Sequence, residues 1–313
     1  MDQANAKRGA LLALAGLTLI WSFNWVVMKW AMQFAGPFDF SALRYLLGTL
    51  VLFSALLLRG RSLKPPALVP VVLIGLAQTM GFQALVQWAL VDGGAGKTAL
   101  FAYTMPFWVA LLGRLLLSDR LSARHVWGIV GAAIGLLLII APWQGVGGLK
   151  PVLLAIAGGF CWGLGTVLSK RQFQRSTVSM LSLTAWQMLF GTMGLVLLTL
   201  VVPERSIAWS PQLIGAIVYN GLLSSGLAWL LWSLIVNRLP AHVAGVSSLA
   251  IPVMGVGFAW LLLGERPTVS ESIGMVLIVV ALVAVNGRRR GSRRTVAGDG
   301  LDSEPILPQQ RQH

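Results

Sequence analysis

The chain has 313 residues, of which 56% are hydrophobic and 11% are charged, and its mean hydropathy is +0.77. Soluble domains carry about 25% charged residues, so this composition excludes an ordinary water-soluble globule. The net charge of +14 could suggest a nucleic-acid partner, but the basic residues gather between long apolar segments, which favours a membrane protein without one.

Ten apolar segments follow one another along the chain, separated by Pro, Gly and charged residues. Several come close to or exceed the roughly 20 residues that a helix needs to cross a bilayer. The first is longer than the apolar core of a signal peptide, which has about 7 to 15 residues, so we expect it to be retained. The predicted spans are residues 10–32, 40–58, 66–90, 97–117, 122–141, 151–169, 178–202, 211–236, 242–263 and 269–286.

The distribution of lysine and arginine predicts how the spans are oriented. If the amino terminus is cytoplasmic, eighteen of the 24 basic residues fall on the cytoplasmic side. Cytoplasmic loops concentrate Lys and Arg, so we expect both termini in the cytoplasm. Residues 288–313 are basic and poor in apolar residues, which predicts a disordered cytoplasmic tail whose arginines attract anionic membrane lipids.

The two halves of the chain repeat each other. The stretch MPFWVALLGRLLLSDRLSARHVWG, from residue 105, aligns without a gap with IPVMGVGFAWLLLGERPTVSESIG, from residue 251. This alignment pairs Pro106 with Pro252 and Gly128 with Gly274. Each proline removes a backbone hydrogen bond from its helix, which predicts a kink in span four and a kink in span nine. The kinks could be hinges for gating or static bends.

The repeat defines two units, residues 1–147 and residues 148–287, each with five predicted spans. Because five is odd, the second unit must enter the membrane from the opposite side. Inverted repeats of this kind are found in many secondary transporters. The predicted fold class is therefore an all-α integral membrane protein, with ten transmembrane helices arranged as two inverted five-helix repeats.

Basic residues near the ends of spans have two possible roles. WSFNWVVMK, at 21–29, and WGLGTVLSK, at 162–170, place Lys29 and Lys170 at corresponding positions. Such lysines can extend their amines to the membrane interface. The alternative is contact with a charged group of a substrate, for which Lys29 and Arg44 are the candidates.

These paired motifs resemble the EamA family of the drug/metabolite transporter superfamily. Spans one and six carry tryptophan, small and polar residues and then lysine, and spans four and nine carry proline with an acid thirteen residues later. The resemblance covers nearly the whole chain outside the tail. It implies a single-chain carrier of the bacterial inner membrane that exports small metabolites by alternating access. The sequence is most similar to bacterial aromatic amino-acid exporters, which implies aromatic or other neutral amino acids as substrates. Export of another metabolite or of a drug within the same superfamily is the alternative.

Other function classes are weighed by the chemistry they require. Neither HExxH nor GxSxG nor a pair of acids is present to support a membrane enzyme, and we expect no cofactor or metal.

Acidic residues do not fall in the middle of a predicted span, which favours uniport, although protons can also be coupled at the edge of a span. A channel or scaffold remains an alternative. The many small residues are explained by packing within the bundle, so we expect a monomer.

Neutral polar and aromatic side chains within the spans predict the substrate cavity. Stacking on aromatic walls holds a ring while a few dipoles hold a head group, so such a cavity suits a zwitterion with an apolar side chain. Hydrogen bonding between helices is the alternative role of each polar residue. The candidate lining residues are Asn24, Gln78, Phe82, Phe101, Tyr103, Trp162, Thr166 and Ser247.

Overall fold

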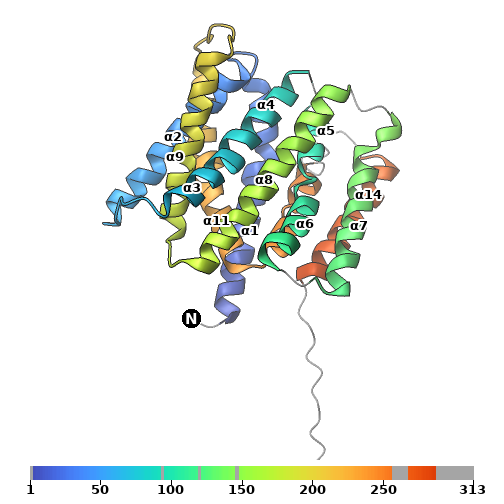
Figure 1. Cartoon of the computed structure of the whole chain (residues 1–313). Helices are drawn as coiled ribbons and strands as arrows, with labels where there is room; N and C mark the ends of the chain where they lie inside the picture. Colours follow the sequence, from blue (N-terminus) through green and yellow to red (C-terminus); the bar gives the residue numbers. More distant parts are fainter. Residues whose placement is uncertain (1–2, 93–94, 119–120, 145–147, 256–266, 287–313) are drawn as a thin grey trace, which may run out of the picture.

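The computed structural model describes residues 3–92, 95–118, 121–144, 148–255 and 267–286, and every regular element within them is helical (Figure 1). Eight helical segments of these residues are long and apolar enough to cross a membrane, and two shorter apolar helices cover 241–255 and 269–285. The predicted all-α membrane fold is confirmed. The end of the ninth predicted span and the tail, residues 288–313, lie outside the described residues.

The helices match the predicted spans in order, and some spans consist of more than one element. Their bounds are α1 (Gln3–Ala31), α2 (Pro37–Leu58), α3 (Leu68–Ile74), η1 (Gly75–Gly81), α4 (Phe82–Asp92), α5 (Ala95–Ala102), α6 (Met105–Leu117), α7 (Ala123–Ile140), η2 (Pro142–Gln144), α8 (Leu149–Arg175), α9 (Met180–Val201), α10 (Pro211–Tyr219), η3 (Asn220–Leu227), α11 (Ala228–Arg238), α12 (Ala241–Ser247) and α14 (Val269–Asn286).

The third and eighth spans each contain a π-helical segment, η1 and η3, at corresponding places. Gly75 and Gly221, near the starts of these segments, are separated by 146 residues, like Pro106 and Pro252. π-Helical turns are rare and occur mostly where a helix is locally distorted. The segment η1 lies where α9 approaches closely: a Cβ atom at Gly75 would lie 2.4 Å from the carbonyl oxygen of Gln187, on α9.

Spans four and nine are interrupted at corresponding places. The fourth span stops at Ala102 and resumes at Met105, so Pro106 is the second residue of α6. A proline at the start of a helix loses no hydrogen bond, because the first N–H groups have no partner within the helix. The ninth span stops at Ser247 and is helical again from residue 250, just before Pro252. Both interruptions are short turns whose residues keep helical dihedral angles and hydrogen bonds to the preceding turn, so each span continues through its interruption. Their role as hinges stays a prediction.

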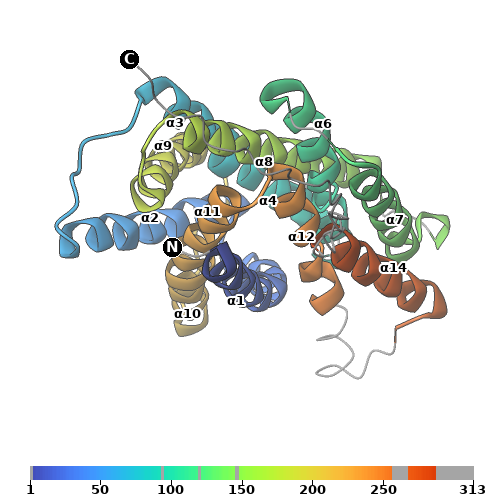
Figure 2. The same cartoon turned by 90° about the horizontal axis from the view of Figure 1, so that it is seen from below.

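The two halves meet through equivalent helices. The hydroxyls of Thr49, on α2, and Thr192, on α9, lie 3.2 Å apart, and these residues occupy corresponding positions 143 residues apart. Helices α7 and α14 lie side by side at one edge of the bundle (Figure 2). A Cβ at Gly135 would lie 2.7 Å from the carbonyl oxygen of Gly274, and one at Gly274 would lie 2.6 Å from that of Gly135. Contacts between equivalent elements are what a duplicated fold predicts.

Candidate functional site

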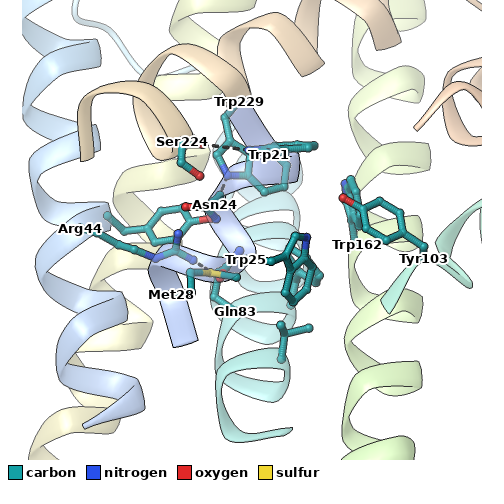
Figure 3. A pocket seen from close by; sticks show the side chains of 13 residues that line it. Trp21, Asn24, Trp25, Met28, Arg44, Gln83, Tyr103, Trp162, Ser224 and Trp229 are labelled. Atoms are coloured by element: carbon teal, nitrogen blue, oxygen red, sulfur yellow. Dashed lines mark hydrogen bonds between the residues drawn. The ribbon is translucent and has the colours of Figure 1, made fainter. Parts of the chain in front are cut away.

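A cavity lies between the two halves, where the middle parts of several helices converge (Figure 3). The volume between the atoms that line the cavity is about 370 Å³, and this figure includes the part that opens to solvent. The first half contributes most of the walls, through α1, α2, α4 and the residue just after α5, and the second half closes them through α8, η3 and α11. The lining residues are Trp21, Asn24, Trp25, Met28, Arg44, Tyr45, Phe82, Gln83, Val86, Tyr103, Trp162, Ser224 and Trp229.

Aromatic rings form one continuous wall of the cavity, centred on Trp162. Its ring centroid lies 5.0 Å from that of Phe82, 5.4 Å from that of Trp21 and 5.6 Å from that of Tyr103. Trp232 lies behind this wall, 5.5 Å from Trp162. Such edge-to-face and tilted pairs stabilise aromatic clusters.

The indole N–H groups of this wall differ in how they are satisfied. Trp21 donates to the carbonyl oxygen of Ser224 at 3.1 Å, and Trp229 donates to the hydroxyl of Tyr45 at 2.8 Å. The indole nitrogen of Trp162 is buried and has no hydrogen-bond partner among the described residues. A buried donor without a partner is costly, which marks this position as one that a ligand could complete.

The polar part of the cavity carries the positive charge of Arg44, one of the two predicted candidates for contact with a charged group of the substrate. Arg44 lies on α2 and is only 1% exposed. Its Nη1 donates to Oδ1 of Asn220 at 2.7 Å and its Nη2 donates to Oε1 of Gln83. On α1, one turn or less from two lining tryptophans, the amide oxygen of Asn24 is buried without a partner among the described residues.

The structure brings together only part of the predicted site. Asn24, Phe82, Tyr103 and Trp162 line the cavity, together with Arg44. Further lining residues were missed, although the spacing of the α1 members by three or four residues places them on one helical face. These missed residues are Trp21, Trp25, Met28, Tyr45, Gln83, Val86, Ser224 and Trp229.

Four other predicted residues lie outside the cavity and pack between helices. With its amide oriented to satisfy both ends, Gln78 donates to Gly165 O and Ser169 Oγ and accepts from Trp232 Nε1, at 3.1 to 3.3 Å. Phe101 packs in a cluster with residues of α4, α7 and α8. Thr166 and Ser247 are fully buried but do not reach the cavity.

The two corresponding lysines contact helix ends instead of the cavity. The ammonium group of Lys29 donates to the carbonyl oxygen of Leu90 at 2.7 Å, and that of Lys170 donates to the carbonyl oxygen of Asn237 at 3.1 Å. Both carbonyls belong to the last turn of a helix, α4 or α11, where carbonyls lack partners within the helix and the helix dipole favours a cation. The symmetric lysines therefore fasten spans one and six to the ends of spans three and eight.

We expect Lys29→Met and Lys170→Met each to lower the thermal midpoint of the detergent-solubilised protein slightly. A cation at a helix end contributes about 0.3–1 kcal/mol, which corresponds to a drop of roughly 1–3 °C. Differential scanning fluorimetry measures this change, and Lys64→Met, at an exposed loop position, is the matched control. Abolished transport with an unchanged midpoint would instead favour the substrate-contact role of Lys29.

Comparison with known proteins places this architecture among transporters. An uncharacterized transporter, YoaV, from Bacillus subtilis is 28% identical over 274 residues, covering 86% of this chain and 93% of that protein. A probable amino-acid metabolite efflux pump from Salmonella typhimurium is 27% identical, covering 88% and 94%. A transporter of S-adenosylmethionine and S-adenosylhomocysteine from Chlamydia trachomatis is 26% identical, covering 87% and 88%. A solved crystal structure, at 23% identity, superposes with a TM-score of 0.76 and covers 89% and 98%.

A family model then matches the chain twice. The EamA-like transporter family matches residues 7–141 and again residues 149–287. Two successive matches agree with the corresponding interruptions, π-helical segments and helix contacts of the structure. Among the described residues, no group of three or more His, Cys, Asp or Glu side chains could hold a metal ion. The chain belongs to the EamA-like transporter family, a family of carriers and not of enzymes.

Proposed function

We propose that this protein exports small neutral amino acids, aromatic ones included, across the bacterial inner membrane by alternating access. The observation that carries the proposal is the cavity between the two halves, because it is lined both by aromatic rings and by residues with buried, unsatisfied polar atoms. Aromatic walls with a few polar groups suit a small ligand that has an apolar side chain and a charged head group. The relatives named as probable amino-acid metabolite efflux pumps support the same substrate class.

The transport cycle follows from the duplication. We propose that residues 1–147 and 148–287 form two inverted units, with both termini in the cytoplasm, acting as a monomer. Rocking of one unit against the other would open the cavity to each side of the membrane in turn. The interruptions before Pro106 and near Pro252 are the proposed hinges, because they lie at corresponding places of the two units and the regular α-helix is interrupted there.

We propose uniport as the mode of transport. The cavity lining contains no Asp, Glu or His among the described residues, so a proton relay through the site has no carrier there. Substrate would then move down its own gradient, and an imposed pH gradient would not drive it.

Counterflow in proteoliposomes tests the proposal. Vesicles preloaded with unlabelled phenylalanine should accumulate labelled phenylalanine and threonine, but neither a labelled sugar nor a cationic dye. S-Adenosylmethionine belongs in the same panel, because a relative is named for its transport. Accumulation should be unchanged when a protonophore is added. Movement of the dye or the sugar alone would overturn the amino-acid assignment, and dependence on a protonophore would overturn uniport.

A further inference from the structure

We propose that Arg44 binds the carboxylate of the substrate, so that the cavity selects metabolites that carry a free carboxylate. This inference rests on the proposed function, since it names the chemical group that the same cavity recognises. It also predicts which metabolites the cavity rejects. A metabolite that lacks the carboxylate, or that carries a net positive charge, should be rejected even when its apolar part is the same as that of a substrate.

The first argument is the state of the guanidinium group. Arg44 is buried, and both partners of its hydrogen bonds, Asn220 and Gln83, are neutral amides. Among the described residues, no carboxylate lies within ion-pair distance of Arg44. A buried charge is costly unless it is paired, so a site with this composition gains most from a ligand that supplies the anion.

The second argument is the unused capacity of Arg44. Its Nε is buried and has no hydrogen-bond partner in the described part of the chain. The ring of Tyr45 lies 4.8 Å from the guanidinium carbon and that of Phe40 lies 5.8 Å from it, so aromatic groups hold the group in place. The guanidinium group still has N–H groups beyond the two that donate to Asn220 and Gln83, and its planar arrangement can meet a carboxylate at two points, which a lysine could not do.

The third argument is a second polar group in the same cavity. Figure 3 shows Asn24, on α1, lying between Arg44 and the tryptophans of the aromatic wall. Its Oδ1 is a buried acceptor to which no described residue donates a hydrogen bond. An ammonium group needs acceptors, and the faces of nearby tryptophan rings also attract a cation. A carboxylate at Arg44 and an ammonium at Asn24 are the two head groups that an α-amino acid carries on one carbon.

The fourth argument concerns what fills the rest of the cavity. Met28, Phe82, Val86, Tyr103 and Trp162 provide its apolar surface. A hydrophobic side chain of the ligand would lie there while the head group stays with Arg44 and Asn24. No acidic residue among the described lining residues offsets Arg44, so a cationic metabolite would meet uncompensated repulsion.

The experiment compares four ligands that share one ring and differ in their charged groups. Phenylalanine carries both groups, 3-phenylpropionate only the carboxylate, and phenylalaninamide only the ammonium; phenyl phosphate replaces the carboxylate by another anion. Each is titrated against the full-length protein by tryptophan fluorescence and tested as a competitor of counterflow. We expect phenylalaninamide to bind at least about tenfold more weakly than phenylalanine, because a buried polar partner left unpaired costs that much or more.

Variants of Arg44 assign the discrimination to this residue. In Arg44→Gln the ratio of affinities for phenylalanine and its amide should fall to within about twofold, whereas Arg44→Lys should keep part of it because the charge remains. Arg59→Gln, an exposed arginine at the end of the same helix, is the matched control and should leave the ratio unchanged. The ratio of the two affinities is informative even if Arg44→Gln lowers the amount of protein in the membrane, because both affinities are measured on the protein that folds.

The possible results separate this inference from the proposed function. Equal binding of phenylalanine and its amide to the wild-type protein, or an unchanged ratio in Arg44→Gln, would overturn the role of Arg44 while leaving amino-acid export standing. Tighter binding of phenyl phosphate than of phenylalanine would overturn the carboxylate assignment in favour of a phosphate. Absence of amino-acid counterflow, together with carboxylate-dependent binding, would overturn the proposed function but not the role of Arg44.

Discussion

Trp162→Ala should reduce amino-acid counterflow by at least about tenfold, because the loss of about 1.4 kcal/mol of binding already corresponds to that factor. Trp162 is 1% exposed, and its ring contacts those of Trp21, Phe82, Tyr103 and Trp232. The alanine variant removes the surface on which an apolar side chain would rest. It also leaves a cavity in the aromatic cluster, which costs about 3–5 kcal/mol in a core.

A second variant separates binding from stability. Trp162→Phe keeps a ring at the centre of the wall but removes the unsatisfied indole N–H, so we expect nearly normal membrane abundance with weakened substrate binding. Trp127→Ala is the matched control, because Trp127 lies on α7 and is 74% exposed. Counterflow is measured per amount of protein in the vesicles. Normal transport by a stable Trp162→Ala protein would exclude the aromatic wall from substrate binding.

Much of the architecture could be predicted from the sequence, because bilayer physics leaves strong local signals. Apolar segments long enough to cross a membrane must be helical, and this requirement fixed the order of the elements. The ungapped alignment of the segments around Pro106 and Pro252 predicted the duplication. The same prolines predicted kinks in spans four and nine, although a proline alone does not show how many residues leave the regular α-helix.

The cavity was harder to predict, since it depends on which face of each helix points inward. Spacing by four residues placed Gln78 and Phe82 on one face of an α-helix. The π-helical segment η1 ends between them and changes that register, because a π-helical turn holds more residues than an α-helical turn. Phe82 therefore lines the cavity, whereas Gln78 packs against Gly165 on α8. Local sequence carried no clear signal for this change.

The buried position of Arg44 was also hard to predict from the sequence. Its position near the start of a span is compatible with a side chain that reaches the membrane interface. Only the packing of α2 against α4 and η3 turns the side chain inward, where Gln83 and Asn220 hold it. Those partners lie 39 and 176 residues away along the chain, so no local pattern could have revealed them.

Gly191→Leu should prevent the two halves from packing, and we expect little or no folded protein in the membrane. A Cβ at Gly191, on α9, would lie 2.3 Å from the Cβ of Thr79 and 2.6 Å from the carbonyl oxygen of Gly75. Both atoms belong to or adjoin the backbone of η1, so neither can move away as the end of a flexible side chain could. The contact is also where Thr79 donates a buried hydrogen bond to Gln187 at 2.9 Å, which separation of the helices would break.

The alanine variants make this prediction quantitative. Overpacking of a well-packed core typically costs about 1–3 kcal/mol, and the short backbone contact at Gly191 places Gly191→Ala at or above the upper end. That predicts a fall in thermal midpoint of roughly 6–12 °C. The corresponding residue of the first half, Gly48, is less crowded: its nearest neighbour would be the Cβ of Ser225, at 2.8 Å, so Gly48→Ala should have a smaller effect.

The control for this series is Gly131→Leu on α7, where an added Cβ would meet nothing within 4 Å. It introduces the same side chain into a membrane helix but touches no helix contact, so its thermal midpoint should match that of the parent protein. A Gly191→Leu protein as abundant and as stable as Gly131→Leu would show that α9 and η1 do not approach this closely. Since η1 continues directly into α4, such a result would also remove the support that holds Phe82 and Gln83 at the cavity wall.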